Sequence, residues 1–515
     1  MNEDNGIGRR TFMKRAAVAA LCGTAPCLAH GEQPRQSEAV RKLTIETDGP
    51  ARLEVRGSRE KMFQPERALM DRTARVGAGK GQYYLGHFTS TGTAVLHLPV
   101  GRYTIIAEKG LEFHRLEKVV ELNVDRSVRL TPGRWVSMAS KGWWSGDLHV
   151  HRPPTDAKIL LAAEDLNLGV FFTIWNSENY WEGKKIPEDP VERLDATHVA
   201  TLMNAEDERG GGAWMMHNLK VPLDLSAKGR WYPQGNAFVE RAKDQGAWFE
   251  CEKPIWWEAP VMAAITSIDS LGVLHNHYNQ YGMVADEAWG RPRDRDLYPG
   301  DEGFSDYSLS LYYRYLNLGM RLPASAGSAS GVLLSPPGYN RVYAYAPDGF
   351  SVESFYSALR AGRNFVTNGP MLAFSVNGKM PGDTLQISSD AHLEVAAEAL
   401  ARDPIDRIEI LANGEVVADT AGSKLEKVIK PANHTWLAAR CFLKRGLTIR
   451  LAHSSPIYLA GKRQTWDSSR DRAYFAKWID DLVSESEEDS KRFQSEERKE
   501  EIHRIYWTAR SFYTS

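Results

Sequence analysis

Hydrophobic and polar residues alternate in several short segments between Leu43 and about Leu130. Alternation with a period of two, interrupted by Gly and Pro turns, is typical of strands that bury one face. Residues 41–136 are therefore expected to form a small β-sandwich module. The strands expected in it are Ala51–Val55, Ala94–Leu98, Tyr103–Ala107 and Val119–Val124.

In residues 137–370, strand-like apolar runs alternate with helical stretches. This alternation predicts an α/β domain with a largely parallel sheet, either closed into a barrel or open. In barrel folds the catalytic residues lie where the strands end and the following loops begin. The expected strands are Val170–Ile174, Val199–Asn204, Ala213–His217, Ala247–Cys251, Ser270–Leu274 and Arg341–Ala346; the expected helices are Asp156–Leu166, Ala237–Gln245, Ser308–Leu318 and Val352–Ala361.

Short strands return in residues 371–460, where a second β-sandwich is expected from Ala373–Val376, Arg407–Leu411 and Thr448–Leu451. In residues 461–515, Gly and Pro become rare and aromatic residues recur at helical spacing. This pattern predicts two amphipathic helices docked on the rest of the protein.

The composition is that of an ordinary folded protein, with 42% of its 515 residues hydrophobic and 25% charged. This composition excludes a disordered or fibrous chain, and the length predicts about three or four domains. The 64 basic and 66 acidic residues give a net charge of −2. The chain therefore lacks the excess of positive charge that is typical of nucleic-acid-binding proteins. No apolar run reaches the roughly 18 residues that span a bilayer, so no integral membrane segment is expected. The expected partner is a small-molecule or carbohydrate substrate.

Residues 1–29 resemble a bacterial twin-arginine signal, with Arg9-Arg10, Phe12 and a modest apolar stretch before Ala29. Residues 30–40 are expected to form a polar linker. We therefore expect a periplasmic or secreted protein. Removal of the signal leaves only Cys251 and Cys441, which allow at most one disulfide.

The clearest chemical motif is Gly146-Asp-Leu-His149-Val-His151. Two histidines at positions i and i+2 of a strand point to the same face, close enough to share one metal ion. The alternative is a pair of histidines held at a strand end by ordinary hydrogen bonds.

The segment Trp144-Ser-Gly-Asp-Leu-His-Val-His151 resembles the first motif of the PHP (polymerase and histidinol phosphatase) metallohydrolases, most closely their exported branch of carbaryl-type carbamate hydrolases. The resemblance covers roughly residues 143–370. It implies a distorted (β/α)7 barrel that holds two or three divalent ions, flanked by an N-terminal β-module and a C-terminal β-sandwich. It also implies that His149 and His151 are metal ligands.

The resemblance places further acidic ligands at two points. Asp156 stands near the position of the acidic residue that follows the histidines, although an Asp at a helix start is also a good cap. The bridging glutamate of the family is matched by Glu206, with Glu208 as a second candidate.

Other positions depart from the family pattern. Trp175 and Lys253 stand where histidine ligands are expected, and Gly327-Ser-Ala-Ser-Gly331 lacks both ligands of the last motif. These departures favour a single ion over the family's di- or trinuclear centre.

A second His-x-His pair, His275 and His277, follows another apolar strand. If the strand ends converge, His149, His151, Glu206 and His277 are expected to surround one ion. Three imidazoles and a carboxylate suit Zn²⁺, Mn²⁺ or Fe²⁺. Ordinary loop polarity is the alternative for the second pair.

A metal-bound water would be a nucleophile at neutral pH, with Glu206, Asp207 or Glu208 as proton acceptor. Lys253 is placed to stabilise an oxyanion. The sequence therefore predicts an exported metal-dependent hydrolase of an ester, carbamate, amide or phosphoester.

Two other functions stay open. The first is a catalytically inactive barrel that binds carbohydrate on a tryptophan-rich rim. The alternative role of these tryptophans is packing in the core and at the rim. The second is a metal-free glycosidase with two catalytic carboxylates, for which Asp269 is a further candidate. The tryptophans concerned are Trp143, Trp144, Trp175, Trp181, Trp256 and Trp257.

Overall fold

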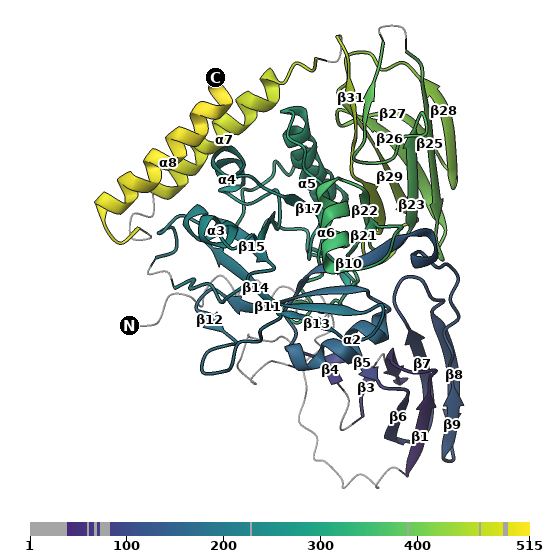
Figure 1. Cartoon of the computed structure of the whole chain (residues 1–515). Coiled ribbons are helices and arrows are strands. Elements are labelled where there is room, and N and C mark those ends of the chain that lie inside the picture. Colours follow the sequence, from purple (N-terminus) through teal and green to yellow (C-terminus); the bar gives the residue numbers. More distant parts are fainter. Residues whose placement is uncertain are drawn as a thin grey trace.

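The computed structural model describes residues 39–58, 61–65, 69–72, 83–226, 229–388, 391–462, 465–487 and 493–515. The predicted signal segment and almost all of the predicted linker lie outside these ranges. The described chain is a mixed α/β protein with several sheets and seven α-helices (Figure 1). None of these helices combines the length and apolarity that crossing a membrane requires.

The N-terminal part contains two sheets that share one hydrophobic core, which includes Leu43, Leu53, Phe88 and Ile105. One sheet has the order β6-β1-β9, and the other has the order β4-β5-β2-β7-β8 with β3 paired to β2. The strands are β1 (Val40–Glu46), β2 (Ala51–Arg56), β3 (Met62–Phe63), β4 (Leu69–Arg72), β5 (Tyr83–Ser90), β6 (Thr93–Pro99), β7 (Gly101–Glu108), β8 (Leu116–Leu122) and β9 (Arg126–Arg129).

The central part is built on strands that follow one another across a sheet. Pairing is parallel for β10–β11, β11–β14, β16–β17 and β17–β20, while β15 runs antiparallel between β14 and β16. These strands are β10 (Trp143–Val150), β11 (Leu168–Trp175), β14 (Val199–Arg209), β15 (Gly212–His217), β16 (Trp248–Cys251), β17 (Ser270–Leu274) and β20 (Ala324–Ala326).

The chain after β20 returns to the first strand of this series. Val150 and Ser330 form a parallel bridge, and the His151 backbone N–H donates to the Ser330 carbonyl at 2.7 Å. On its other side β10 pairs with β21 (Arg341–Tyr345), which pairs in turn with β22 (Asn364–Thr367).

Helices and short hairpin strands connect the central strands. The helices are α2 (Ala157–Glu164), α3 (Asn236–Lys243), α4 (Ala259–Ile265), α5 (Gly300–Asn317) and α6 (Val352–Arg360), with the 3-10 turns η2 (Ala139–Lys141) and η3 (Pro154–Asp156). The short strands are β12 (Glu178–Asn179), β13 (Val191–Arg193), β18 (Tyr278–Asn279) and β19 (Gly282–Met283).

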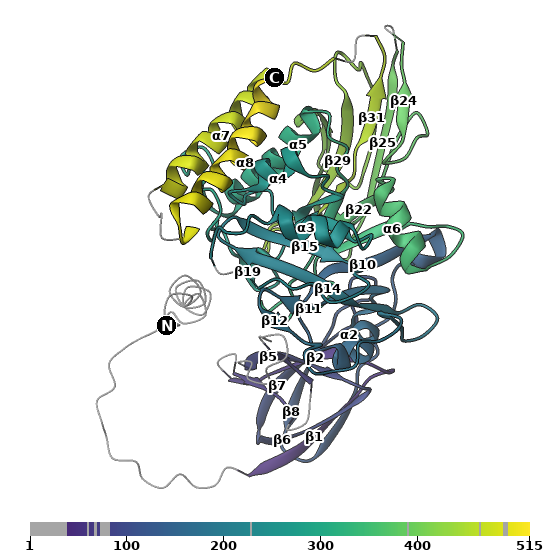
Figure 2. The same cartoon turned by 60° about the vertical axis from the view of Figure 1, so that its left-hand side comes forward.

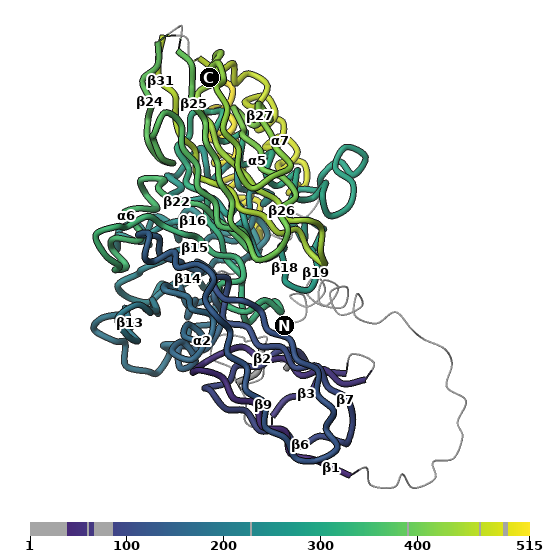
Figure 3. The backbone as a smooth tube through the Cα atoms, turned by 90° about the vertical axis from the view of Figure 1, so that its right-hand side faces the viewer, coloured from purple at the N-terminus to yellow at the C-terminus, as the bar shows by residue number. Residues whose placement is uncertain are grey.

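The C-terminal part adds a sheet of order β23-β25-β28 and a larger group of strands that share its core. Because β22 pairs with both β21 and β30, backbone hydrogen bonding continues across residue 370, where the sequence places a domain boundary. Figure 3 shows these sheets and the N-terminal sheets at opposite ends of the molecule. The strands are β23 (Met371–Val376), β24 (Thr384–Gln386), β25 (Leu393–Leu400), β26 (Ile405–Ala412), β27 (Glu415–Thr420), β28 (Lys424–Ile429), β29 (Trp436–Leu443), β30 (Leu451–Ser454) and β31 (Ile457–Ala460).

The last strand expected here begins later than its pattern suggests, since β30 starts at Leu451 and not at Thr448. The Asn368 side chain accounts for the difference, because its amide donates to the Ile449 carbonyl and accepts from the Leu451 N–H. Cys251 in β16 and Cys441 in β29 are both buried free thiols.

We expect His453 of β30 to make the protein sensitive to acid. Burial lowers its pKa to about 3, and its Nε2 lies 2.9 Å from the Tyr313 hydroxyl. In the unfolded protein the His453 imidazole becomes protonated below about pH 6.5, whereas in the folded protein it stays neutral until about pH 3. His453 therefore contributes its full stability above about pH 6.5, and this contribution is lost as the pH falls toward 3. The stability difference between wild type and His453→Gln should shrink by about 2–4 kcal/mol between pH 7 and pH 4. Denaturant unfolding at several pH values measures it.

His97→Gln is the control for this prediction, because His97 lies exposed on β6. A wild-type to His453→Gln difference that stays constant with pH would contradict the prediction.

Two long helices, α7 (Ser469–Glu487) and α8 (Glu496–Thr514), form the C-terminal tail where helical spacing predicted them. They pack on each other and on α4, beside the central part (Figure 2). Their apolar faces, which include Phe475, Trp478, Ile502 and Tyr506, join the central hydrophobic core.

Candidate metal centre

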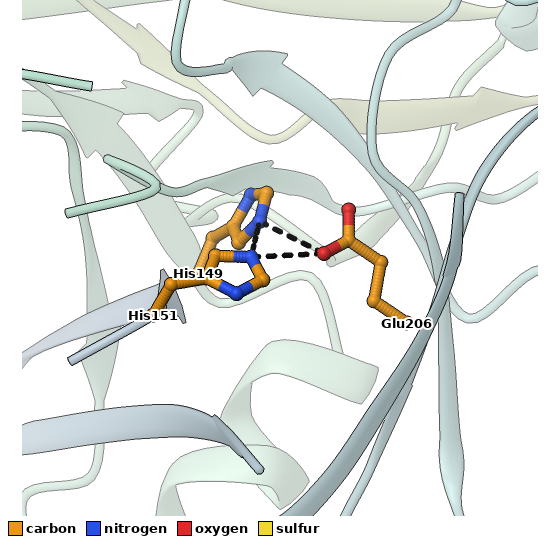
Figure 4. Close-up of side chains that lie close together, drawn as sticks. All are labelled: His149, His151 and Glu206. Carbon is orange, nitrogen blue, oxygen red and sulfur yellow. Dashed lines mark hydrogen bonds and ion pairs between the residues drawn. The ribbon is translucent and has the colours of Figure 1, made fainter. Parts of the chain in front are cut away.

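His149, His151 and Glu206 converge at the end of β10 and the later half of β14. The Nε2 atoms of the two histidines lie 2.8 Å apart, and Glu206 Oε2 lies 2.8 Å from His151 Nε2 and 3.6 Å from His149 Nε2. Figure 4 shows the two imidazoles and the carboxylate directed at one another. The i, i+2 spacing thus places both histidines on one face, and the strand β11 separates them in the sheet from Glu206.

Asp147, which precedes the histidines in the same motif, holds the backbone around them. Its Oδ1 accepts from the backbone N–H groups of His149 and Ser328, both at 3.0 Å, and its Oδ2 accepts from Gly338 at 2.6 Å. A side chain at Gly327 would place Cβ 2.3 Å from His149 Cβ, so only glycine fits there. The segment after β20 is therefore tied closely against His149.

The three groups are almost completely buried, with 2–3% of each residue exposed. Burial tends to raise the pKa of the Glu206 carboxyl, but the charges and hydrogen bonds of His149 and His151 hold it well below its usual range. Burial tends to lower the pKa of His149, and the Glu206 carboxylate raises it above its usual value. The carboxylate is thus stabilised by positive charge, which a divalent cation also supplies.

This donor set fits a metal ion. Two imidazole nitrogens and a carboxylate oxygen all lie within 4.8 Å of one another. Metal–nitrogen bonds of about 2.0–2.1 Å in tetrahedral geometry separate ligand atoms by about 3.3 Å. The observed separations of 2.8 and 3.6 Å lie on either side of that value, and three protein ligands are the number typical of catalytic zinc sites.

Glu252 and Lys253 lie beside this group as a buried ion pair. Glu252 Oε1 is 3.7 Å from His149 Nδ1 and 2.7 Å from Lys253 Nζ, and each residue is 3% exposed. The ammonium also lies 4.6 Å from the centre of the Trp256 ring. A carboxylate facing the second nitrogen of a ligating histidine is the arrangement that orients such ligands. The sequence pointed to Lys253, whereas nothing in its spacing indicated Glu252.

The other predicted ligands are not in the group that the described residues form. Asp156 occupies the N-cap position of α2 without a capping hydrogen bond from its side chain, and Thr155 Oγ1 lies 3.3 Å from its carboxylate. Glu208 accepts a hydrogen bond from Trp175 Nε1 at 2.9 Å. Trp175, which stands in place of a histidine, therefore holds a carboxylate beside the site.

The second histidine pair is engaged with other partners. His275 Nε2 lies 3.1 Å from Ser308 Oγ, and His275 Nδ1 accepts from the His277 N–H at 3.4 Å. The His277 ring stacks on Phe304 with centroids 5.5 Å apart. Burial holds the pKa of both histidines well below the usual value. Both are neutral imidazoles, and their role as ligands stays a prediction.

The tryptophans proposed as a sugar platform pack against the protein interior. Trp175 and Trp256 are 6% and 1% exposed, and the remaining four are partly buried against the cores. Asp269, a candidate for the glycosidase, precedes β17 and pairs with Lys243 and Arg360 at 3.3 and 3.1 Å. It therefore lies at the opposite end of the parallel strands from Glu206.

Compared with models of known protein families and with curated proteins, the chain matches none. The fold and the site define the protein as a mixed α/β chain whose buried two-histidine, one-carboxylate group could bind a metal ion.

Proposed function

We propose that the protein is a metal-dependent hydrolase of an ester, carbamate, amide or phosphoester. The observation that carries this proposal is the convergence of His149, His151 and Glu206 in a buried site. Zn²⁺, Mn²⁺ and Fe²⁺ all suit these ligands. We also propose export to the periplasm or beyond, which rests on the twin-arginine motif at Arg9-Arg10.

We further propose that β10, β11, β14, β15, β16, β17 and β20 form a distorted (β/α)7 barrel of PHP type. The succession of strand pairs supports this, together with the bridge by which Ser330 returns to the end of β10. The pairs of sheets on either side, each pair around one core, would then be the two β-sandwiches. The motif around His149 is the basis of the PHP resemblance.

Each residue near the site has a role in this proposal. A divalent ion supplies Lewis acidity and lowers the pKa of water that it binds toward about 7. His149, His151 and Glu206 would hold the ion, and the Glu252 carboxylate, 3.7 Å from His149 Nδ1, would help to orient the ring of His149. The Glu208 carboxylate, which accepts a hydrogen bond from Trp175 Nε1, would be the group that takes the proton of the attacking water. The Lys253 ammonium stabilises negative charge that develops on the substrate.

Metal content and hydrolysis together test this proposal. Full-length protein purified without chelator or nickel affinity should contain about one transition-metal ion per chain. It should hydrolyse at least one of p-nitrophenyl acetate, p-nitrophenyl phosphate, a p-nitrophenyl carbamate and a p-nitroanilide. A chelator should abolish the activity and the metal should restore it.

Glu206→Gln and Glu208→Gln form a matched pair for the same experiment. Glu206→Gln should lose both metal and activity, whereas Glu208→Gln should keep the metal and lose about 100-fold or more in kcat. Absence of metal uptake in the wild type contradicts the proposal. A bound ion without hydrolysis also contradicts it, because two histidines and a carboxylate hold Fe²⁺ in oxygen-activating enzymes as well.

A further inference from the structure

The segment from Glu252 to Glu258 connects β16 to α4 and carries the buried ion pair beside the metal group. Glu252 faces His149 Nδ1 at 3.7 Å at its start. At its other end, the Glu258 N–H donates to the Gly211 carbonyl at 3.0 Å. The segment thus faces His149 at its start and is hydrogen-bonded at its end to the turn between β14, the strand that carries Glu206, and β15.

The glycines of that turn allow the segment to pack closely on it. A Cβ at Gly211 would lie 2.2 Å from Glu258 Oε2, and one at Gly212 would lie 2.7 Å from Trp256 Cβ. Glu206 is three residues before Arg209, the last residue of β14. The contact between Gly211 and Glu258 therefore holds the strand end that carries one ligand against the segment that carries Glu252.

The Glu258 carboxyl is buried and held by two side chains from distant parts of the chain. Its Oε1 accepts a hydrogen bond from the Tyr506 hydroxyl of α8, and its Oε2 accepts from Gln234 Nε2 at 3.1 Å. Glu258 is 3% exposed and Tyr506 is completely buried. Burial raises the Glu258 pKa to about 7, while Tyr506 and the charge of Arg209 oppose the rise.

The C-terminal helices make further contacts with the same stretch. Trp478 Nε1 of α7 donates to the Trp257 carbonyl at 3.0 Å, and the Tyr513 hydroxyl of α8 donates to the Pro260 carbonyl at 2.7 Å. Among these contacts, that of Tyr506 is made to a side chain, whereas the other two are made to backbone carbonyls. Tyr506 is therefore the residue of the helices that fixes the orientation of the Glu258 carboxyl.

We propose that Tyr506 is a positioning residue for the metal centre. Tyr506 holds Glu258 against Gly211. This contact keeps the ion pair of Glu252 and Lys253 at a constant position relative to the metal-binding residues. The C-terminal helices are then a part of the site and not an independent appendage. This inference rests on the proposed metal centre and adds to it an element that lies about 300 residues further along the chain than Glu206.

The test compares Tyr506→Phe with Tyr513→Phe in the full-length chain. Each change deletes one hydroxyl from α8, but only Tyr506 contacts the Glu258 carboxyl. Zn²⁺ affinity is measured by chelator competition, and the environment of the ion is measured from the visible absorption of the Co²⁺-loaded protein. Tyr506→Phe should weaken Zn²⁺ binding by up to about 10-fold, the lower end of the effect of losing a direct outer-shell partner, and change the Co²⁺ spectrum. Tyr513→Phe should lower the melting temperature and leave both readouts unchanged.

Glu258→Leu is a second test of the same contact. It removes the carboxylate oxygen that accepts from the Tyr506 hydroxyl at a similar side-chain size, and it should reproduce the spectral change. If Tyr506→Phe and Glu258→Leu both match Tyr513→Phe in affinity and spectrum, the helices have only a structural role and the inference is wrong. Wild-type protein that takes up no Zn²⁺ or Co²⁺ overturns the proposed function, and this inference with it.

Discussion

His151→Ala is expected to weaken metal binding by more than about 100-fold. His151 Nε2 lies 2.8 Å from both His149 Nε2 and Glu206 Oε2, so its removal leaves two ligands where three converge. Loss of an outer-shell partner alone costs about 10–100-fold in metal affinity, and loss of a ligand exceeds that range. Isothermal titration with Zn²⁺ under chelator competition measures the change, and His149→Ala should behave in the same way.

The matched control is His275→Ala, which makes the same truncation at a histidine that is equally buried. Because His275 is engaged with Ser308 and with the backbone of His277, its loss should leave Zn²⁺ affinity within about threefold of the wild type. A large loss of affinity in His275→Ala would show that the second histidine pair joins the site. Unchanged affinity in His151→Ala would contradict the metal centre itself.

Lys253→Met is expected to destabilise the folded protein by about 3–5 kcal/mol. The Lys253 ammonium is the ion-pair partner of Glu252, and both groups are 3% exposed. Removing one partner of a buried ion pair leaves an uncompensated charge in the low-dielectric interior. This lowers the free energy of unfolding by far more than the intact pair adds to it. Urea unfolding at pH 7 with metal-free protein measures the effect without a contribution from the ion.

The double variant Glu252→Gln/Lys253→Met separates charge from packing. With both charges removed, the free energy of unfolding should recover at least half of the loss in Lys253→Met. If the double variant is as unstable as the single one, the cost comes from the lost contact of the Lys253 ammonium with the Trp256 ring, and the ion pair contributes little.

The sequence predicted the local features of this protein well. Period-two alternation located strands such as β2, β6 and β7, and helical spacing located α7 and α8, because both depend only on neighbouring residues. The same reasoning placed His149 and His151 on one face of a strand. A strand fixes the direction of every second side chain, whatever the rest of the fold.

Features that depend on several segments were harder to predict. The identity of Glu206 as the third member of the group came from a resemblance, since no periodicity relates it to His149. Glu252 was missed because its proximity to His149 follows from the order of strands across the sheet. Asp147 was quoted in the motif, but its backbone contacts with Ser328 and Gly338 join segments about 180–190 residues apart.

By itself, then, the sequence determined an alternating α/β chain with strand-rich regions on either side, a helical tail and one histidine pair able to share an ion. Only the tertiary structure decided which side chains meet that pair. It placed Glu206 against the two histidines, engaged His275 with Ser308, and brought Tyr506 to Glu258 from 248 residues away. The physical reason is that strand order and loop packing set these contacts, through hydrogen bonds and buried charges that have no counterpart in the spacing of residues along the chain.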